Sequence, residues 1–324
     1  MLGAGGVLGA AWMAGALPAV ERSLGHPAAD TDLIIGTSAG SVLAAALRCG
    51  VPVESIVSHQ RGVDTPWGRP AGEFDRESGP LPPMPRLRLG SPRLLTSVRR
   101  GGVRISPWVV ASGLMPLGRG QHDSLAGLLN AMLAQADGRI TRGTVAWPCQ
   151  PTWIMSIDYD TGRRVAFGRP DAPPSALPDA VVASCSIPGW HAPKVINGRR
   201  YVDGGVHSTT SLELVGQVAV DRVVVLAPMA SYRTDRPRNP AVQAERLLRR
   251  LYTAGLSREV ALVRAAGIEV TVLAPGPEDL HAIGANLMDP SRRERVLETS
   301  LRTSADHMAN LRWRPTAGGQ RLAS

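Results

Sequence analysis

The chain has 324 residues, of which 44% are hydrophobic, so it is long enough to bury a sizeable core. Its three cysteines are scattered and odd in number, which excludes a disulfide framework and a paired metal-ligand motif and favours a reducing, cytoplasmic setting. The formal net charge of +9 comes almost entirely from arginine, because Lys194 is the only lysine. This charge indicates either attraction to anionic lipid surfaces or the arginine bias of GC-rich coding DNA. No nucleic-acid partner is expected, because zinc-finger spacing and RNP-type aromatics are absent from the sequence.

The N-terminal stretch is almost uncharged but predicts neither a signal peptide nor a membrane span. No basic segment precedes it, and its glycines together with Pro18 disfavour a spanning helix. A glycine-rich loop, Gly3 to Gly9, follows only two residues, although such loops normally follow a buried strand. We therefore expect the true start of the protein to lie upstream of Met1, with a strand reduced to a stub as the alternative.

Helices and strands are expected to alternate on either side of one long segment of different composition. Before this segment we expect a helix at 10–23, a strand at 33–35, and helices at 38–48 and 52–59. Residues 60–121 are rich in Pro, Gly and Arg and lack clear periodicity. We interpret them as an insert that forms a mobile lid over the site, with a tolerated surface insertion as the alternative.

The second half of the chain continues the alternation. We expect helices at 124–135, 177–184, 212–218 and 240–266, and strands at 152–157, 164–167, 222–226 and 268–273. A hairpin at 194–203 is expected to turn at Asn197-Gly198, and the region from about 275 is expected to be mostly helical and polar. This order predicts a single domain over residues 1–324, with an α/β fold and a mainly parallel central sheet.

A serine flanked by glycines stands between an expected strand and an expected helix, in Gly36-Thr37-Ser38-Ala39-Gly40. A sharp turn at this point projects the serine hydroxyl from the sheet, and the helix N-terminus places unpaired N–H groups beside it. Ser38 is therefore the candidate nucleophile. Only one strand has room before it, which excludes the ordinary α/β-hydrolase order, and Ser41 occupies the position at which an S-x-x-K pattern requires lysine.

Two further motifs offer the remaining parts of a hydrolase site. In Ala4-Gly5-Gly6-Val7-Leu8-Gly9, Leu8 breaks the dinucleotide fingerprint and no Lys-Ser or Lys-Thr follows, so an oxyanion hole is the expected use of the loop. Asp203-Gly204-Gly205 follows a strand-like run, and its aspartate could accept the Ser38 proton directly. Taken alone, however, Asp-Gly-Gly is more often a plain turn.

Together, in this order and spacing, the motifs resemble the patatin-like phospholipase family. The resemblance covers most of the chain, through the glycine-rich loop, the serine turn, Ser186-Ile187-Pro188-Gly189 and Asp203-Gly204-Gly205. It implies a three-layer α/β/α fold, a dyad of Ser38 as nucleophile and Asp203 as proton acceptor, and no metal or organic cofactor. The residues it assigns to the oxyanion hole are Gly5, Gly6 and Val7, and those it assigns to motif support are Gly9, Gly36, Gly40, Gly204 and Gly205.

The sequence departs from the family pattern at two positions. Ala4 replaces the first glycine of the loop, and Leu8 replaces the common Arg or Lys. Because a backbone oxyanion hole can survive both changes, ester hydrolysis is a firmer expectation than phospholipid preference. A rival Ser-Asp-His triad would use His207, His281 or His307, to which we assign no catalytic role. The tryptophans are expected mainly in the core, with contact to acyl chains or membrane as the alternative: Trp12, Trp67, Trp108 and Trp190.

The sequence thus predicts a serine acyl hydrolase that cleaves phospholipid or other acyl esters through an acyl-enzyme. One alternative is a non-catalytic lipid- or acyl-binding protein that keeps the fold, and another is a general carboxylesterase or thioesterase. We expect a cytoplasmic protein with peripheral association to an anionic membrane surface. A calcium-dependent route is not expected, because the sequence has no dense run of oxygen ligands.

Overall fold

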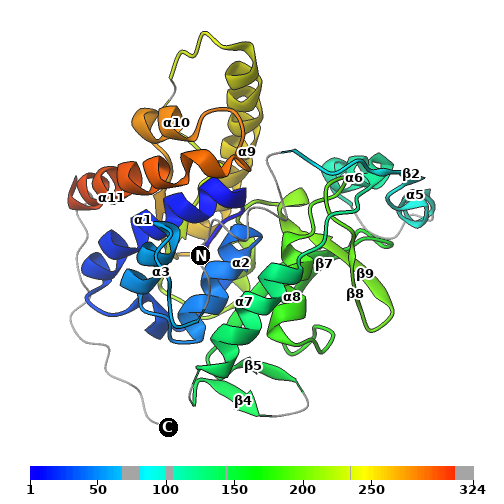
Figure 1. Cartoon of the computed structure of the whole chain (residues 1–324), viewed down its shortest axis with the longest axis horizontal. Coiled ribbons are helices and arrows are strands. Elements are labelled where there is room, and N and C mark those ends of the chain that lie inside the picture. The colour runs from blue at the N-terminus through cyan, green and yellow to red at the C-terminus, as the bar shows by residue number, and fades with distance from the viewer. Residues whose placement is uncertain (68–80, 100–104, 137, 143–144, 234, 311–324) are drawn as a thin grey trace.

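The computed structural model describes residues 1–67, 81–99, 105–136, 138–142, 145–233 and 235–310 (Figure 1). A sheet runs through the middle of the molecule, and its central part is parallel. Strand β1 (Ile34–Thr37) pairs in parallel with β6 (Thr152–Asp158), and β10 (Arg222–Leu226) pairs in parallel with β11 (Glu269–Leu273). Leu2 joins the two pairs through parallel bridges to Gly36 and Leu226. The expectation of an α/β fold with a mainly parallel central sheet is confirmed.

Antiparallel strands extend this sheet around β6. Strand β7 (Arg164–Phe167) and strand β9 (Arg199–Asp203) both pair antiparallel with β6, and β8 (Lys194–Ile196) pairs with β9. The β8–β9 hairpin turns at Asn197-Gly198, where both residues have positive φ, of 50° and 74°. Asn-Gly suits such a turn because both residues tolerate this conformation, and the expected hairpin is confirmed.

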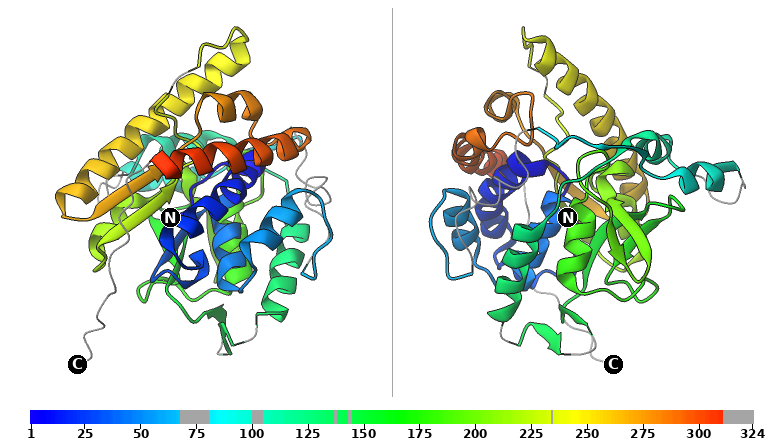
Figure 2. Two further views of the ribbon diagram at one scale, coloured as in Figure 1. Left: turned by 90° about the vertical axis from the view of Figure 1, so that its left-hand side faces the viewer. Right: turned by 45° about the vertical axis from the view of Figure 1, so that its right-hand side comes forward.

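Two apolar clusters on opposite faces of the sheet make the fold three-layered, because successive side chains of a strand point to opposite faces. On one face, Ile34 and Ile154 join α1 (Gly6–Leu24), α2 (Ala39–Arg48), α3 (Val53–Gln60), α7 (Asp123–Ala134), α8 (Leu177–Cys185) and α11 (Arg293–Asn310). On the other face, Ile35 and Met155 join α9 (Pro240–Ala265) and the 3₁₀ helix η3 (Leu212–Gln217). Figure 2 shows the helices on both sides of the strands.

Most expected elements are present, with differences at three places. The first helix begins at Gly6, directly after the glycine-rich loop, and residues 212–217 form a 3₁₀ helix in place of an α-helix. The hairpin of β4 (Ile140–Arg142) and β5 (Ala146–Pro148) was not expected. The expectation of helices after residue 275 is confirmed by α10 (Pro277–Ile283), the 3₁₀ helix η4 (Pro290–Arg292) and α11.

The C-terminal helix α11 packs apolar side chains into the core, although the sequence suggests a mostly polar segment. Val296 and Leu297 are fully buried against α1, and the Ser300 hydroxyl donates to the Trp12 carbonyl oxygen at 2.6 Å. Gly15 permits this approach, because a Cβ there would lie 2.8 Å from the Leu297 carbonyl oxygen. Within the described residues, no helix is long and apolar enough to cross a bilayer.

Within the expected insert at 60–121, the elements from 86 to 117 form a separate lobe at the right of Figure 1, whereas Trp67 packs against His59 of α3 in the larger apolar cluster. The lobe contains the antiparallel pair β2 (Arg86–Leu89) and β3 (Pro116–Leu117), with helices α5 (Pro92–Arg99) and α6 (Pro107–Leu114). These helices and strands are too short to produce a clear period of hydrophobic residues in the sequence. The lobe is joined to the sheet by the Tyr159 hydroxyl, which donates to the Ser112 carbonyl oxygen at 2.7 Å. That the lobe moves as a lid stays a prediction, and residues 68–80 and 100–104 lie outside the described residues.

Candidate active site

Ser38 and Asp203 come together because β1 and β9 meet end to end along one edge of β6. Thr37 pairs with Met155, and Asp203 pairs with the next residue, Ser156. Because β7 occupies the opposite edge of β6, both strands must lie on the same side. β1 runs parallel to β6 and β9 runs antiparallel, so their C-terminal ends face each other. Across this junction the Ser38 hydroxyl lies near enough to the Asp203 carboxylate to favour its charged form.

Ser38 is held in a backbone conformation that non-glycine residues rarely adopt. Its φ of 52° and ψ of −122° carry a cost of roughly 1–3 kcal/mol, which the surroundings must offset. Its N–H donates to the Ser184 hydroxyl at 2.9 Å, and that hydroxyl donates to the Met155 carbonyl oxygen at 2.6 Å. The Ser41 hydroxyl donates to the Ser38 carbonyl oxygen at 2.6 Å. Ser184 and Ser41 therefore fix the turn, and no sequence motif pointed to this role.

The glycines around Ser38 allow backbone segments to approach closely. A Cβ at Gly36 would lie 2.6 Å from the Gly40 carbonyl oxygen, and a Cβ at Gly40 would lie 2.1 Å from the Leu2 carbonyl oxygen. Strand β1, helix α2 and the chain before the glycine-rich loop therefore pack backbone to backbone. This contact sets Ser38 beside the glycine-rich loop.

The glycines after Asp203 likewise allow close packing around the turn that holds Asp203. A Cβ at Gly204 would lie 2.7 Å from the Met155 carbonyl oxygen, and one at Gly205 would lie 3.1 Å from the Ala4 Cβ. The Gly205 N–H donates to the Asp203 carboxylate at 2.7 Å. The turn is thus pressed between β6 and the glycine-rich loop, which brings all three sequence motifs to one place.

Burial makes the Asp203 carboxylate a stronger base than a solvated aspartate. Only 5% of the residue is exposed, and burial raises its pKa from 3.8 to about 6, although the nearby Ser38 hydroxyl and the Gly205 N–H act in the opposite direction. At neutral pH the group is still ionised and can accept a proton. The neighbouring Cys185 thiol is no rival nucleophile, because burial and the Asp203 charge raise its pKa far above the ordinary value.

The glycine-rich loop places two free N–H groups beside Ser38. As the first residues of α1, Gly6 and Val7 have no intrahelical acceptor for their N–H groups, and both line the cavity that contains Ser38. Ala39, the first residue of α2, lines the same cavity. The N–H of Leu8 is already taken by the Leu287 carbonyl oxygen at 2.9 Å.

Two other loop positions serve packing. Gly5 lies against the ring of Pro228, since a Cβ there would be 2.7 Å from the proline Cγ, and it does not line the cavity. The Leu8 side chain is fully buried in the larger apolar cluster. The loop position that is basic in the family pattern therefore contributes to the core of this chain.

The cavity at Ser38 has a volume of about 170 Å³ and mostly apolar walls from α1, α2, α3 and α7. His59, His122, His191 and Arg293 add polar groups to its wall. The His122 and His191 rings stack at 4.0 Å, and burial lowers the His191 pKa to about 3, so this ring is neutral. Neither ring nitrogen of His191 has a hydrogen-bond partner among the described residues.

None of the three histidines considered for a rival triad lines this cavity in the described part of the chain. His207 lies 3.9 Å from the Glu213 carboxylate and is only partly exposed. His281 belongs to α10 and His307 to α11. Among the tryptophans, Trp12 is buried in the core and Trp67 lines the cavity, whereas Trp108 is exposed.

A larger hollow of about 610 Å³ lies beside the first residues of β1 and β10, and neither Ser38 nor Asp203 lines it. Met1 and Leu2 border it, and the Met1 amino group donates to the Val224 carbonyl oxygen at 2.6 Å. The two residues before the glycine-rich loop therefore run as a strand between β1 and β10. The expectation of an upstream start stays a prediction.

A serine at a tight strand–helix turn beside a buried carboxylate, on a three-layer α/β/α scaffold, is the arrangement expected of the serine hydrolase class. Comparison with known families agrees with this class, because the model of the family described as patatin-like phospholipase matches residues 1–215. The match covers about two thirds of the chain and includes the glycine-rich loop, Ser38 and Asp203. The chain belongs to the patatin-like phospholipase family, and this membership supports lipid acyl hydrolase activity in general.

Proposed function

We propose that the protein is a serine acyl hydrolase that cleaves ester bonds of phospholipids or other acyl lipids, with Ser38 as nucleophile and Asp203 as base. The observation that carries this proposal is the position of Ser38, which lies against a buried carboxylate where the ends of β1 and β9 meet and which lines an apolar cavity. None of the described histidines is among the groups that shift the Asp203 pKa, so we infer that the proton passes directly from serine to aspartate.

In the first half of the reaction the Ser38 Oγ attacks the ester carbonyl carbon while Asp203 takes the hydroxyl proton. The carbonyl oxygen becomes an oxyanion, which the N–H groups of Gly6 and Val7, with that of Ala39, are placed to stabilise. Gly5 supports this oxyanion hole by setting the loop against Pro228. Collapse of the intermediate breaks the bond to the alcohol, which leaves with the proton from Asp203.

In the second half, Asp203 removes a proton from water as the water oxygen attacks the acyl-enzyme. A second oxyanion forms at the same N–H groups, and its collapse breaks the bond to the Ser38 Oγ, which recovers the proton. The fatty acid leaves and the dyad is restored. Neither half requires a metal ion or an organic cofactor.

The cavity favours an acyl chain of short or medium length. Its volume of about 170 Å³ is below the roughly 300–1,000 Å³ of sites that hold drug-sized ligands. Its apolar walls suit a hydrocarbon chain, whereas Arg293 is the basic group in the described wall. Since Leu8 removes the usual cation from the loop, a carboxylesterase or thioesterase acting on short acyl chains is the second candidate function.

The test is labelling of purified protein with a fluorophosphonate probe, followed by a panel of esters that differ in acyl length and head group. Wild type should be labelled, and Ser38→Ala should not. Ser257→Ala is the matched control, because this exposed helical serine bonds only its own helix at the Thr253 carbonyl oxygen. Equal labelling of wild type and Ser38→Ala would refute the nucleophile. Lipid binding without turnover would favour the non-catalytic alternative.

We also infer that the protein works in the cytoplasm and associates reversibly with anionic membrane surfaces. The arginine-rich net charge of +9 supports attraction to such surfaces. No nucleic-acid partner is part of the proposal. Cell fractionation that finds the protein only in the soluble fraction, at low salt as well as high salt, would contradict the membrane association.

A further inference from the structure

Over its first half, helix α9 turns two arginines, Arg246 and Arg249, inward and three leucines outward. Arg246 and Arg249 are only 6% and 2% exposed, whereas Leu247, Leu248 and Leu251 are 60%, 38% and 49% exposed. A helix of a water-soluble domain normally shows the opposite arrangement. The helix lies beyond residues 1–215, so the family match says nothing about it.

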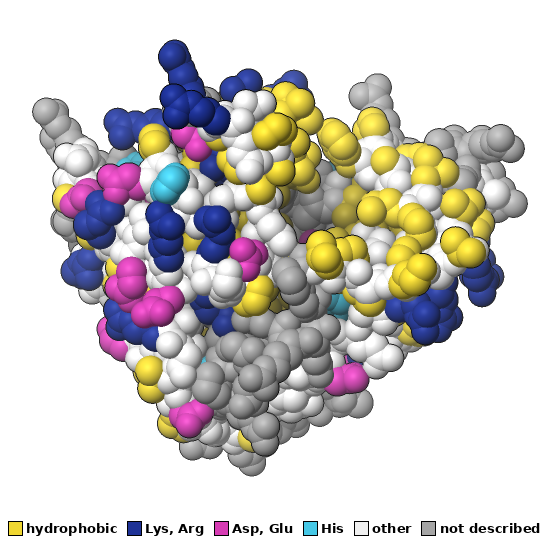
Figure 3. All heavy atoms as spheres, turned by 45° about the horizontal axis from the view of Figure 1, so that its top comes forward, with side chains coloured by type: hydrophobic (Ala, Val, Ile, Leu, Met, Phe, Trp, Pro, Cys, Tyr) yellow, Lys and Arg dark blue, Asp and Glu magenta, His cyan; other side chains and the backbone are white. Residues whose placement is uncertain are grey.

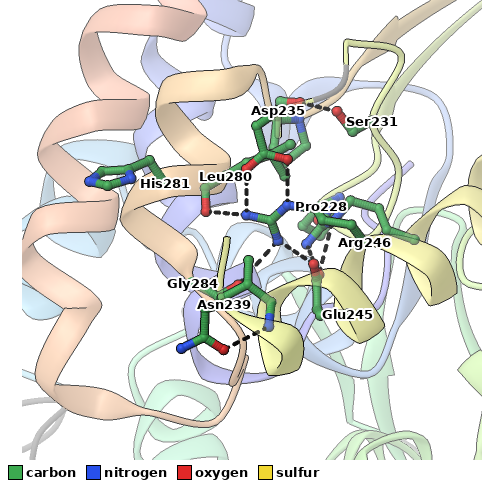
Figure 4. A network of polar contacts seen from close by, with 12 residues as sticks. Pro228, Ser231, Asp235, Asn239, Glu245, Arg246, Leu280, His281 and Gly284 are labelled. Atoms are coloured by element: carbon green, nitrogen blue, oxygen red, sulfur yellow. Dashed lines mark hydrogen bonds and ion pairs between the residues drawn. The ribbon is translucent and has the colours of Figure 1, made fainter. Parts of the chain in front are cut away.

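The buried Arg246 side chain fixes the rotation of α9 through a complete set of acceptors. The Arg246 guanidinium bonds Asp235 through two parallel contacts of 2.9 and 3.1 Å, and it also donates to Glu245 and to the carbonyl oxygens of Leu280 and Gly284 (Figure 4). These contacts use all five of its N–H donors. Turning the helix to hide the leucines would leave this group without partners, which is more costly than exposing apolar surface.

A second apolar surface lies on the lobe of β2 and α6. Leu87 and Trp108 are 103% and 55% exposed, and other exposed apolar residues adjoin them: Met84, Leu89, Leu114 and Met115. Figure 3 shows hydrophobic side chains gathered on this lobe and on the neighbouring face near the top. Neighbouring exposed apolar side chains that form a patch mark an interaction site.

Both surfaces border the candidate active site. Arg249 donates to the carbonyl oxygen of Pro228, whose ring packs on Gly5 of the glycine-rich loop. Further along α9, the Glu259 carboxylate accepts hydrogen bonds from Ser208 and Thr210, which follow the Asp203 turn. On the other lobe, the Met115 side chain lies over Gly189, next to the segment that lines the cavity.

Exposed arginines lie beside the leucines on both surfaces. On β2, Arg86 and Arg88 alternate with Leu87 and Leu89, and on α9 the exposed Arg250 lies between Leu248 and Leu251. Within the described residues, none of these three arginines makes an ion pair with a carboxylate. Apolar side chains surrounded by unpaired cations suit a layer with an apolar interior and anionic head groups.

We propose that the leucine face of α9 (Leu247, Leu248 and Leu251) and the apolar face of the β2–α6 lobe form one docking surface for an anionic lipid layer. This inference rests on the proposed function, because the docked layer supplies the ester that Ser38 cleaves. The two faces insert on either side of the site, and the arginines contact phosphate groups at the layer surface. A lipid can then reach the cavity without crossing water.

The experiment measures binding of the purified full chain to sedimented vesicles of phosphatidylcholine with phosphatidylglycerol. Leu247→Gln/Leu251→Gln and Leu87→Gln/Trp108→Gln should each lower the partition coefficient roughly tenfold or more. The matched control is Leu262→Gln, which is 65% exposed on the same helix but about 16 Å farther along it, and which should bind as wild type does. Arg86→Gln/Arg88→Gln should weaken binding to these vesicles roughly tenfold without affecting vesicles of phosphatidylcholine alone.

Hydrolysis of a soluble short-chain ester separates this inference from the proposed function. All the surface variants should keep the wild-type kcat/KM for that ester while losing turnover of vesicle lipids. If wild type hydrolyses the soluble ester but does not bind vesicles, the docking surface is wrong and the function stands. If the protein binds vesicles through these residues but hydrolyses no ester, the function is wrong and the docking surface stands.

Two other results would overturn the docking surface. Equal loss of vesicle binding in Leu262→Gln would show that binding is not located at this face. A concentration-dependent dimer in analytical ultracentrifugation, abolished by Leu247→Gln/Leu251→Gln, would show that a second copy of the chain covers the leucines. Normal vesicle binding by Ser38→Ala would support the inference, because docking does not need catalysis.

Discussion

Replacing Asp203 by asparagine should remove most of the activity and at the same time stabilise the protein at neutral pH. Asparagine keeps the size of the side chain and can still accept the Gly205 N–H, which now bonds the carboxylate at 2.7 Å. It cannot accept the Ser38 proton. We expect kcat/KM to fall about 10²–10⁴-fold, the usual contribution of a general base.

The stability change follows from the buried charge. Folding raises the Asp203 pKa from 3.8 to about 6, chiefly by desolvation, so the folded state binds this proton more tightly than the unfolded chain. The charged carboxylate therefore destabilises the fold above pH 6 by about 3 kcal/mol, and this penalty vanishes below about pH 4. Asp203→Asn should unfold with a free energy higher than wild type by up to about 3 kcal/mol at pH 7.5, with no difference near pH 4.

The assay is urea unfolding of both proteins across this pH range, together with ester hydrolysis. For wild type, kcat/KM should rise with pH through about 6 and then level off, because the base must be ionised. Asp179→Asn is the control, since this half-exposed carboxylate pairs with Lys194 at the surface and should change stability by no more than about 1 kcal/mol. A less stable Asp203→Asn at every pH, or one with wild-type kcat/KM, would refute the reasoning.

Three further substitutions, one of them with a control variant, test the packing and the proposed dyad. Gly40→Ala should lower the free energy of unfolding by at least about 2 kcal/mol, because its Cβ would lie 2.1 Å from the Leu2 carbonyl oxygen. The control, Gly127→Ala, lies on open helix surface and should raise the free energy of unfolding by about 0.5–1 kcal/mol. Urea unfolding measures both changes. Ser184→Ala leaves the Ser38 N–H without its partner and should cost about 1–3 kcal/mol while slowing fluorophosphonate labelling; unchanged labelling would remove its role in positioning the nucleophile. His207→Gln should hydrolyse soluble esters as wild type does, and a loss as large as that of Ser38→Ala would reinstate a triad.

Short-range sequence patterns are enough to predict those parts of the site that depend only on residues close together in the sequence. The glycine spacing around Ser38, the glycine-rich loop and the Asn197-Gly198 turn act through local backbone conformation, which neighbouring residues determine. The apolar strand at 222–226 was likewise predicted with its observed bounds, because a buried parallel strand is a continuous apolar run. Family resemblance added the pairing of Ser38 with Asp203.

The elements of the lobe were not predictable in the same way. Strands of two to four residues and helices of eight residues in β2, β3, α5 and α6 contain too few turns to establish a period. The cavity histidines were missed for a different reason. His59, His122 and His191 come from distant segments, and no local spacing relates them.

By itself, the amino-acid sequence determined the nucleophile turn, the glycine-rich loop and the alternation of helices and strands, since each depends on residues close together in the chain. The tertiary structure alone decided that β9 runs head to head with β1, which is why Asp203 reaches Ser38 and acquires its raised pKa. It also decided that α9 buries Arg246 and Arg249 and exposes Leu247, Leu248 and Leu251. Helical periodicity defines two faces, but only Asp235, Leu280 and Gly284, brought in from elsewhere in the chain, make the arginine face the inner one.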